Sequence, residues 1–164
     1  MKEKLIFEKS SSKHLQFVEE VKILIDREAR KDNMVYQTEE ALSEQIMNED
    51  AVLVFSESRL VGYICLEYWK NYIEIGGLVV DPEYRESGIG YQLTVEVIEL
   101  ALSKKSDKEI IILANSVSCL IPKKIGFVVK EKNYFHSEVW ELCEMCESRH
   151  KFPDCRCVGL VYPV

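Results

Sequence analysis

Apolar and polar residues recur along the chain with helix and strand periods, and these periods predict the first elements. A short strand is expected at residues 4–8. Apolar residues at helical spacing, beginning at Leu15 and ending at Ile25, predict a helix behind the hydroxyls of Ser10–Ser12. Thr38 is the expected N-cap of a second helix, TEEALSEQIM, which carries acidic residues in its first turn.

The middle of the chain is typical of a β-hairpin followed by another strand. Ala51–Phe55 and Val61–Trp69 are the two expected arms of the hairpin, with a turn at Glu57–Leu60 between them. After a second turn at Asn71, the segment Tyr72–Val80 is the next strand. Three consecutive strands joined by short turns predict a sheet with an antiparallel part.

The strand Tyr72–Val80 has the most informative pattern. Ile73 and Ile75 fall on one face, whereas Tyr72 and Glu74 fall on the other. The pair Gly76-Gly77 interrupts the strand, and glycine inside a strand marks a bulge or a close approach of another backbone. We therefore expect a bulge or a close backbone approach at this glycine pair.

The second half of the chain alternates helices and strands. A helix is expected from Gly88 to Lys105, a buried strand at Glu109–Leu113, a short helix at Ser116–Ile125 and a strand at Phe127–Glu131. The residues that share the apolar stripe of the long helix are Ile89, Leu93, Val97, Leu100 and Ala101. This order predicts a mixed α/β (α+β) fold, with one sheet between helices. Residues 1–164 contain no linker or repeat and are expected to form a single domain.

Composition narrows the possible functions. The 21 basic and 28 acidic residues give a net charge of −7, which argues against general nucleic-acid binding. No apolar run is long enough to cross a membrane. The first residues, MKEKLIFEKSSS, do not resemble a secretory signal, so a cytoplasmic location with reduced thiols is expected.

One motif between a strand and a helix carries candidate chemistry: Arg85-Glu86-Ser87-Gly88-Ile89-Gly90. Glycines let a ligand approach the backbone, and the free N–H groups of a helix N-terminus attract anions. An arginine adds a charge-assisted contact. The segment does not match the dinucleotide-binding fingerprint, because the third glycine is absent. It does not match the P-loop either, because the Gly-Lys-Ser/Thr sequence is absent.

Over residues 1–135 the chain resembles the GNAT superfamily of acyl-CoA-dependent N-acetyltransferases. The resemblance rests on IEIGGLVVDPEYR, on the Arg85–Gly90 motif and on NSVSCLIPKKIGF. It implies that the motif binds the pyrophosphate of acetyl-CoA and that the preceding strand, Leu78, Val79 and Val80, binds the pantetheine arm. Asn115 matches a further position that contacts the cofactor in this family.

The resemblance also implies direct attack of an amine on the thioester. Glu74 is the expected general base, because it lies two residues before the glycine pair. Many family members protonate the leaving thiolate with a tyrosine, but Pro122 stands at that position here. Tyr134 is the acid assigned in its place, with Tyr91 and solvent as alternatives.

Four cysteines are concentrated near the end of the chain, in the segment 142–158. Their spacing, Cys143-x-x-Cys146 followed by Cys155-x-Cys157, is typical of a zinc site with four sulfur ligands, and His150 is an alternative ligand. The tail, including Lys151-Phe152-Pro153, resembles that of a short GNAT subgroup related to N-acetylglutamate synthase. Reduced core thiols or a redox-labile pair are the alternatives to zinc.

These features predict an N-acetyltransferase that modifies a primary amine of a small molecule or an amino acid. The acidic residues of the first hundred positions suit a cationic amine. The alternatives are a non-catalytic acyl-CoA-binding sensor and a zinc-stapled interaction module. Neither nucleic acid nor a membrane is an expected partner, and a homodimer is an expectation that follows only from the resemblance.

Overall fold

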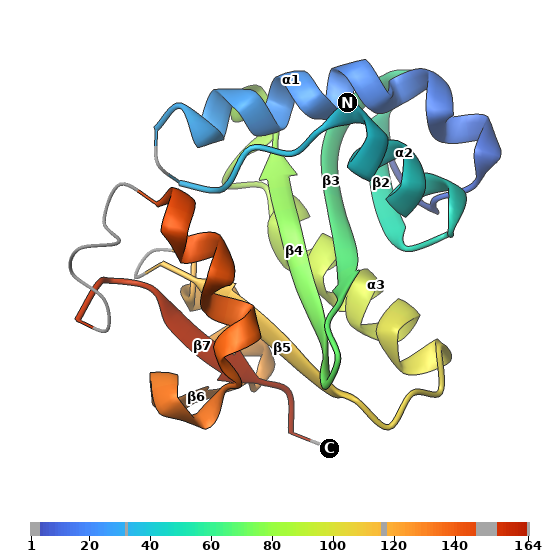
Figure 1. Ribbon diagram of the computed structural model, residues 1–164. Coiled ribbons are helices and arrows are strands. Elements are labelled where there is room, and N and C mark those ends of the chain that lie inside the picture. Colours follow the sequence, from blue (N-terminus) through green and yellow to red (C-terminus); the bar gives the residue numbers. More distant parts are fainter. Residues whose placement is uncertain (1–3, 32, 116–117, 147–153, 164) are drawn as a thin grey trace.

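The computed structural model describes residues 4–31, 33–115, 118–146 and 154–163. Seven strands form one sheet in the order β1-β2-β3-β4-β5-β7-β6 (Figure 1). The strands are β1 Leu5–Lys9, β2 Ala51–Ser56, β3 Arg59–Tyr68, β4 Tyr72–Val80, β5 Glu109–Ala114, β6 Val128–Lys130 and β7 Val158–Val161. Because helices cover this single sheet, the predicted mixed α/β (α+β) class is confirmed.

The sheet is antiparallel except at its centre. Strands β1 to β4 pair as successive antiparallel neighbours, and β5, β7 and β6 form a second antiparallel group. The two groups meet where β4 runs parallel to β5. The crossover between these parallel strands passes through the 3₁₀ turn Pro82–Tyr84 and the helix α3, Ile89–Ser103.

The N-terminal helices cover one face of the first group of strands. Helices α1 (Val18–Ala29) and α2 (Glu39–Met47) pack apolar residues against β2 and β3. Thr38 caps α2 as predicted, because its Oγ1 accepts a hydrogen bond from the amide of Ala41 at 3.2 Å. The N-terminal helix begins later than expected: Ser12–Phe17 is a 3₁₀ helix, and Leu15 is exposed.

Helix α3 covers the opposite face and confirms the predicted apolar stripe. All five predicted stripe residues are buried, together with Ile73 and Ile75 of β4. Tyr72 and Glu74 lie on the other face of β4, as the alternation predicted. None of the described helices combines the length and apolar composition that crossing a bilayer requires.

A third cluster covers the second half of the sheet. The 3₁₀ helix Ser137–Met145 follows the 3₁₀ turn Lys132–Tyr134 and lies in front of β5 and β7 in Figure 1. Phe135 and Val139 pack there against residues of β4, β5 and β7. The short helix α4, Leu120–Ile125, lies between β5 and β6 in the chain, and the predicted start of this helix at Ser116 lies outside the described residues.

Candidate active site

The parallel strands β4 and β5 are joined along only a short part of their length. Their paired positions are Tyr72 with Glu109, Ile73 with Ile110 and Glu74 with Ile111. Beyond Glu74 the strands diverge, and Figure 1 shows the space between them widening toward their carboxyl ends. In open sheets with parallel strands, ligands bind at such a position, outside the carboxyl ends of the strands.

A bulge in β4 begins where the two strands separate. Cys65 of β3 pairs with Gly76, whereas Tyr63, two residues earlier, pairs with Val79, so β4 contains an extra residue. Gly77 has φ of +65°, and a Cβ atom there would lie 3.0 Å from the Cys65 sulfur. The bulge predicted from the glycine pair is therefore present, and it needs glycine for both conformation and space.

The glycine motif forms the N-terminus of α3 at the same end of β4. Gly88 is the N-cap, with φ of +86°, and none of the described side chains caps this end of the helix. The first backbone N–H groups of α3 are therefore available to an anion, which fits a diphosphate group. Ile89 is buried in the core, and the Gly90 carbonyl accepts a hydrogen bond from Thr94.

Arg85 is held by other parts of the protein. Its Nη2 donates to Glu28 at 2.6 Å, and its Nε donates to the Val80 carbonyl at 3.1 Å. The next residue, Glu86, is exposed with φ of +60°, and the Ser87 hydroxyl donates to the Tyr84 carbonyl. The guanidinium thus connects the loop to the end of β4 and to α1.

The remaining predicted cofactor residues follow the bulge in β4 or follow β5. Leu78 and Val80 are partly exposed, and Val79 is buried against the layer formed by α1 and α2. Asn115 comes directly after β5, and its Oδ1 accepts a hydrogen bond from the Ser118 amide at 2.9 Å. The topology therefore places all of these residues at the carboxyl ends of β4 and β5.

Glu74 is buried at the point where the strands separate. Only 8% of the residue is exposed, and its Oε2 accepts a hydrogen bond from the Trp69 indole at 2.7 Å. Burial, followed by the charge of Glu67, raises the pKa of Glu74 to about 8, and the indole hydrogen bond opposes this rise. A carboxyl group with this pKa can take up and release a proton near neutral pH.

Tyr134, the residue expected to protonate the leaving thiolate, is not brought to this place. Tyr134 lies in an exposed turn, and its hydroxyl donates to Glu109 at 2.6 Å. Glu109 is the first residue of β5, so the tyrosine lies at the opposite end of the strand from the gap. Pro122 is buried within α4.

Glu67 and Gln37 lie beside this carboxyl group, although the sequence alone did not single them out. Glu67 of β3 pairs directly with Glu74, and it accepts a hydrogen bond from Gln37 Nε2 at 3.2 Å. The signal that would have revealed Glu67 is the tight turn around Asn71. Counting outward from that turn along two antiparallel strands brings the two glutamates opposite each other.

Comparison with known proteins decides the family of this chain. The model for the acetyltransferase (GNAT) domain matches residues 18–145. The chain belongs to the GNAT family. An uncharacterized N-acetyltransferase of Chlorobaculum tepidum is 34% identical over 82 residues, which are 50% of this chain and 51% of that protein. The chain therefore spans about half the length of this GNAT relative.

Two solved structures show the same GNAT fold. The protein Rv2747 of Mycobacterium tuberculosis, in complex with CoA and NLQ, has a TM-score of 0.74 at 16% identity, over 97% of this chain and 99% of that one. N-acetylglutamate synthase of Neisseria gonorrhoeae, complexed with coenzyme A and N-acetyl-glutamate, has a TM-score of 0.72 at 17% identity. That match covers 98% of this chain but 35% of the synthase.

The predicted zinc site of the cysteine segment is not supported by the described part of the chain. Among the described residues, no group of three or more His, Cys, Asp and Glu side chains is arranged to hold a metal ion. Instead, the Lys132 ammonium lies 2.8 Å from the Cys155 sulfur, where a metal ligand bond was expected. Cys143, Cys146 and Cys157 are free and partly exposed, and His150 and Lys151-Phe152-Pro153 lie outside the described residues.

The pKa values of the cysteine thiols are shifted in different directions by their surroundings. Burial and the neighbouring thiols raise the pKa of Cys143 and of Cys157. For Cys155, burial also acts to raise the pKa, but the Lys132 ammonium and backbone hydrogen bonds outweigh it and lower the pKa. Of these three thiols, Cys155 is therefore the one that ionises most readily.

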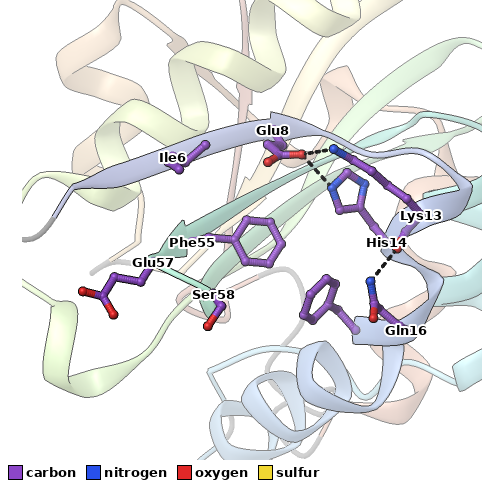
Figure 2. Close-up of a pocket in the computed structure, with 9 residues that line it drawn as sticks. Ile6, Glu8, Lys13, His14, Gln16, Phe55, Glu57 and Ser58 are labelled. Atoms are coloured by element: carbon purple, nitrogen blue, oxygen red, sulfur yellow. Dashed lines mark hydrogen bonds and ion pairs between the residues drawn. The ribbon is translucent and has the colours of Figure 1, made fainter.

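A separate pocket of about 220 Å³ lies at the β1 edge of the sheet, away from β4 and β5. Figure 2 shows the Glu8 carboxylate facing both Lys13 and His14. His14 is buried and stacks on Phe55, and its Nδ1 accepts the Ser11 amide hydrogen bond. These polar groups already pair with one another. Their contacts therefore stabilise the start of the N-terminal 3₁₀ helix.

Proposed function

We propose that the protein is an acetyl-CoA-dependent N-acetyltransferase that modifies a primary amine of a small molecule or an amino acid. The observation that carries this proposal is the position of Glu74. It is a buried carboxyl group with a pKa of about 8, located two residues before the bulge where β4 and β5 separate. A general base requires both this placement and this proton affinity.

The backbone of the chain supplies the binding groups. The free N–H groups at the start of α3 suit a diphosphate, and Arg85 fixes the loop that leads to them. Leu78–Val80 have no partner on β5, so their backbone groups on that side can bind the amide groups of a pantetheine arm. The bound thioester would supply the acetyl group.

The reaction needs two proton transfers, one from the attacking nitrogen and one to the leaving sulfur. Glu74 accepts the proton that the attacking nitrogen loses, while the Trp69 indole holds its carboxylate in place. The proton for the leaving sulfur comes from Tyr91 or from solvent. Tyr91 is in the first turn of α3, beside the glycine motif, whereas Tyr134 is engaged with Glu109.

A second function, acyl-CoA binding without catalysis, is supported by one observation. The position where many family members carry a catalytic tyrosine is the buried Pro122, and Tyr134 lies at the other end of β5. A protein without an acid could still bind the cofactor through α3 and β4. This function predicts acetyl-CoA binding with no release of free thiol.

An amine panel with acetyl-CoA tests the proposal by measuring free thiol and the acetylated product. Turnover of at least one amine is expected, with kcat/KM rising as the pH increases through about 8. Glu74→Gln should lower kcat/KM by about 100-fold at pH 8 and remove this rise. Glu99→Gln, an exposed change on α3, is the matched control and should behave like the parent. Acetyl-CoA binding without turnover of any amine would instead support the non-catalytic function.

A further inference from the structure

We infer that Glu67 is a positioning residue of the acceptor site, where its carboxylate controls the protonation of Glu74 and favours acceptors that bind as ammonium ions. The inference rests on the proposed function of Glu74 as the base. It goes further in giving a role to a second carboxylate and in naming the chemical class of the acceptor. The observations that support it are the contacts that Glu67, Glu74 and Gln37 make.

The two carboxylates share one face of the sheet. Glu67 and Glu74 are direct partners on the antiparallel strands β3 and β4, so their side chains project to the same side. The Glu67 side chain also lies over the bulge, because a Cβ atom at Gly76 would be 3.7 Å from its Oε1. The pair is therefore located where β4 turns away from β5.

Gln37, from the segment between α1 and α2, holds the Glu67 carboxylate in place. Its Nε2 donates to Glu67 Oε1 and lies 3.5 Å from the position of a Cβ atom at Gly77. Its Oε1 is buried and has no hydrogen-bond partner among the described residues. The site thus presents an unsatisfied acceptor beside two carboxylates, and a ligand that donates hydrogen bonds would satisfy it.

The groups that face the pair from the surrounding elements are uncharged. They are the Trp69 indole from the β3–β4 turn, the Gln37 amide, the Cys65 thiol and Tyr63 phenol of β3, and the Ile111 side chain of β5. Burial raises the pKa of Glu67, and burial and the two glutamates raise the pKa of Cys65. No salt bridge in the described part of the chain joins either glutamate to a lysine, arginine or histidine.

Two neighbouring buried carboxyl groups without a cation share one proton near neutral pH. Glu74 holds that proton in the free protein, because it is the more deeply buried of the two. An ammonium ion bound between Glu67 and Gln37 stabilises the doubly ionised pair, so Glu74 releases its proton to solvent. The Glu74 carboxylate can then accept one proton from the bound ammonium ion, which gives the neutral amine that attacks the thioester. The second proton, which the nitrogen loses on attack, passes to solvent.

A titration of the Glu74 carboxyl carbon by carbon-13 NMR tests this inference without an activity assay. The Glu74 signal is assigned by its loss in Glu74→Gln. Glu67→Gln removes the charge but keeps an oxygen for the Gln37 hydrogen bond. We expect the Glu74 midpoint to move from about 8 in the parent to lower pH by about one unit in this variant. Glu99→Gln, on the opposite face, should leave the midpoint unchanged.

Two further measurements keep the test decisive. Glu67→Ser is a second neutral variant and should shift the Glu74 midpoint in the same direction, and thermal melting shows which variants are folded. For an amine that is turned over, the rising limb of kcat/KM should move to lower pH by the same amount. Adding a simple alkylammonium ion to the parent should also lower the Glu74 midpoint.

An unchanged Glu74 midpoint in folded Glu67→Gln and Glu67→Ser would overturn the inference. A midpoint that alkylammonium ions do not move would overturn the assignment of the acceptor class. Both results are independent of catalysis, because the titration needs no substrate. Absence of turnover with every amine, together with the expected midpoints, would count against the proposed function alone.

Discussion

The guanidinium of Arg85 lies 2.6 Å from the carboxylate of Glu28, and this contact joins the glycine loop to the last turns of α1. Glu28 is also contacted by Asn33 at 2.9 Å and by Lys31 at 3.3 Å. Burial acts to raise the pKa of Glu28, but the hydrogen bonds from Arg85 and Asn33 outweigh it and lower the pKa. The ionised carboxylate therefore stabilises the folded state.

Glu28→Gln should reduce the free energy of unfolding at pH 7 by about 1 kcal/mol, because it weakens the contact with a partly exposed arginine. A carboxyl group whose pKa is lowered by folding stabilises the protein above its unfolded pKa. This stabilisation disappears as the pH falls through the folded pKa. The difference between parent and variant should thus shrink below about pH 4.5. Denaturant unfolding at a series of pH values measures this.

The matched control for that change is Glu83→Gln. Glu83 contacts Arg59 at 2.8 Å, but both side chains are largely exposed. The expected loss of stability is smaller than in Glu28→Gln, because solvent screens a contact between two exposed side chains. Equal losses in the two variants would show that the Arg85–Glu28 contact has no special structural importance. Acetyl-CoA binding should weaken in Glu28→Gln and stay unchanged in Glu83→Gln.

The Phe135 ring packs directly on Gly159 of β7, where a Cβ atom would overlap the ring. Gly159→Ala should therefore destabilise the protein by about 1–3 kcal/mol, since the ring or the strand has to shift. Phe135→Leu in the same chain should recover part of this loss, because it removes ring atoms from the contact. A double-mutant cycle measured by denaturant unfolding checks the coupling. Additive effects of the two changes would contradict the contact.

Cys155 and Lys132 allow a test that separates a paired thiolate from a metal ligand. Because the pKa of Cys155 is lowered and that of Cys143 is raised, iodoacetamide should modify Cys155 first as the pH increases. Lys132→Met should move the modification of Cys155 to higher pH. Mass spectrometry of the cysteine peptides measures both effects. One zinc ion per chain, with Cys155 protected until a chelator is added, would instead support the zinc site.

The sequence predicted those parts of the fold that depend on local pattern. The α3 stripe, the bulge at Gly76-Gly77 and the cap at Thr38 each follow from residues close together in the chain. The position of Tyr134 depends on how the chain returns to β5 after β6, and no local pattern determines that path. Glu67 was missed because its importance depends on the register between two strands rather than on its neighbours in sequence.

The prediction of a zinc site from cysteine spacing also depends on tertiary contacts that the sequence does not reveal. Cysteine spacing describes the ligands that a segment can offer, but it does not reveal which other side chains approach them. Lys132 is 23 residues away from Cys155 in the chain, and its ammonium lies against the thiol. Such a contact depends on tertiary packing, so it becomes visible only when the fold is known.

The position of β7 between β5 and β6 has a consequence for the order of biosynthesis. The ribosome makes β6 before β7, yet β6 pairs only with β7 in the described sheet. While the chain is being translated, β6 therefore has no strand to join, and one edge of β5 stays open until Val158–Val161 emerge. The strands β1 to β4 can pair earlier, because each lies beside its neighbour in sequence. Completion of the second half of the sheet is thus a late event of synthesis.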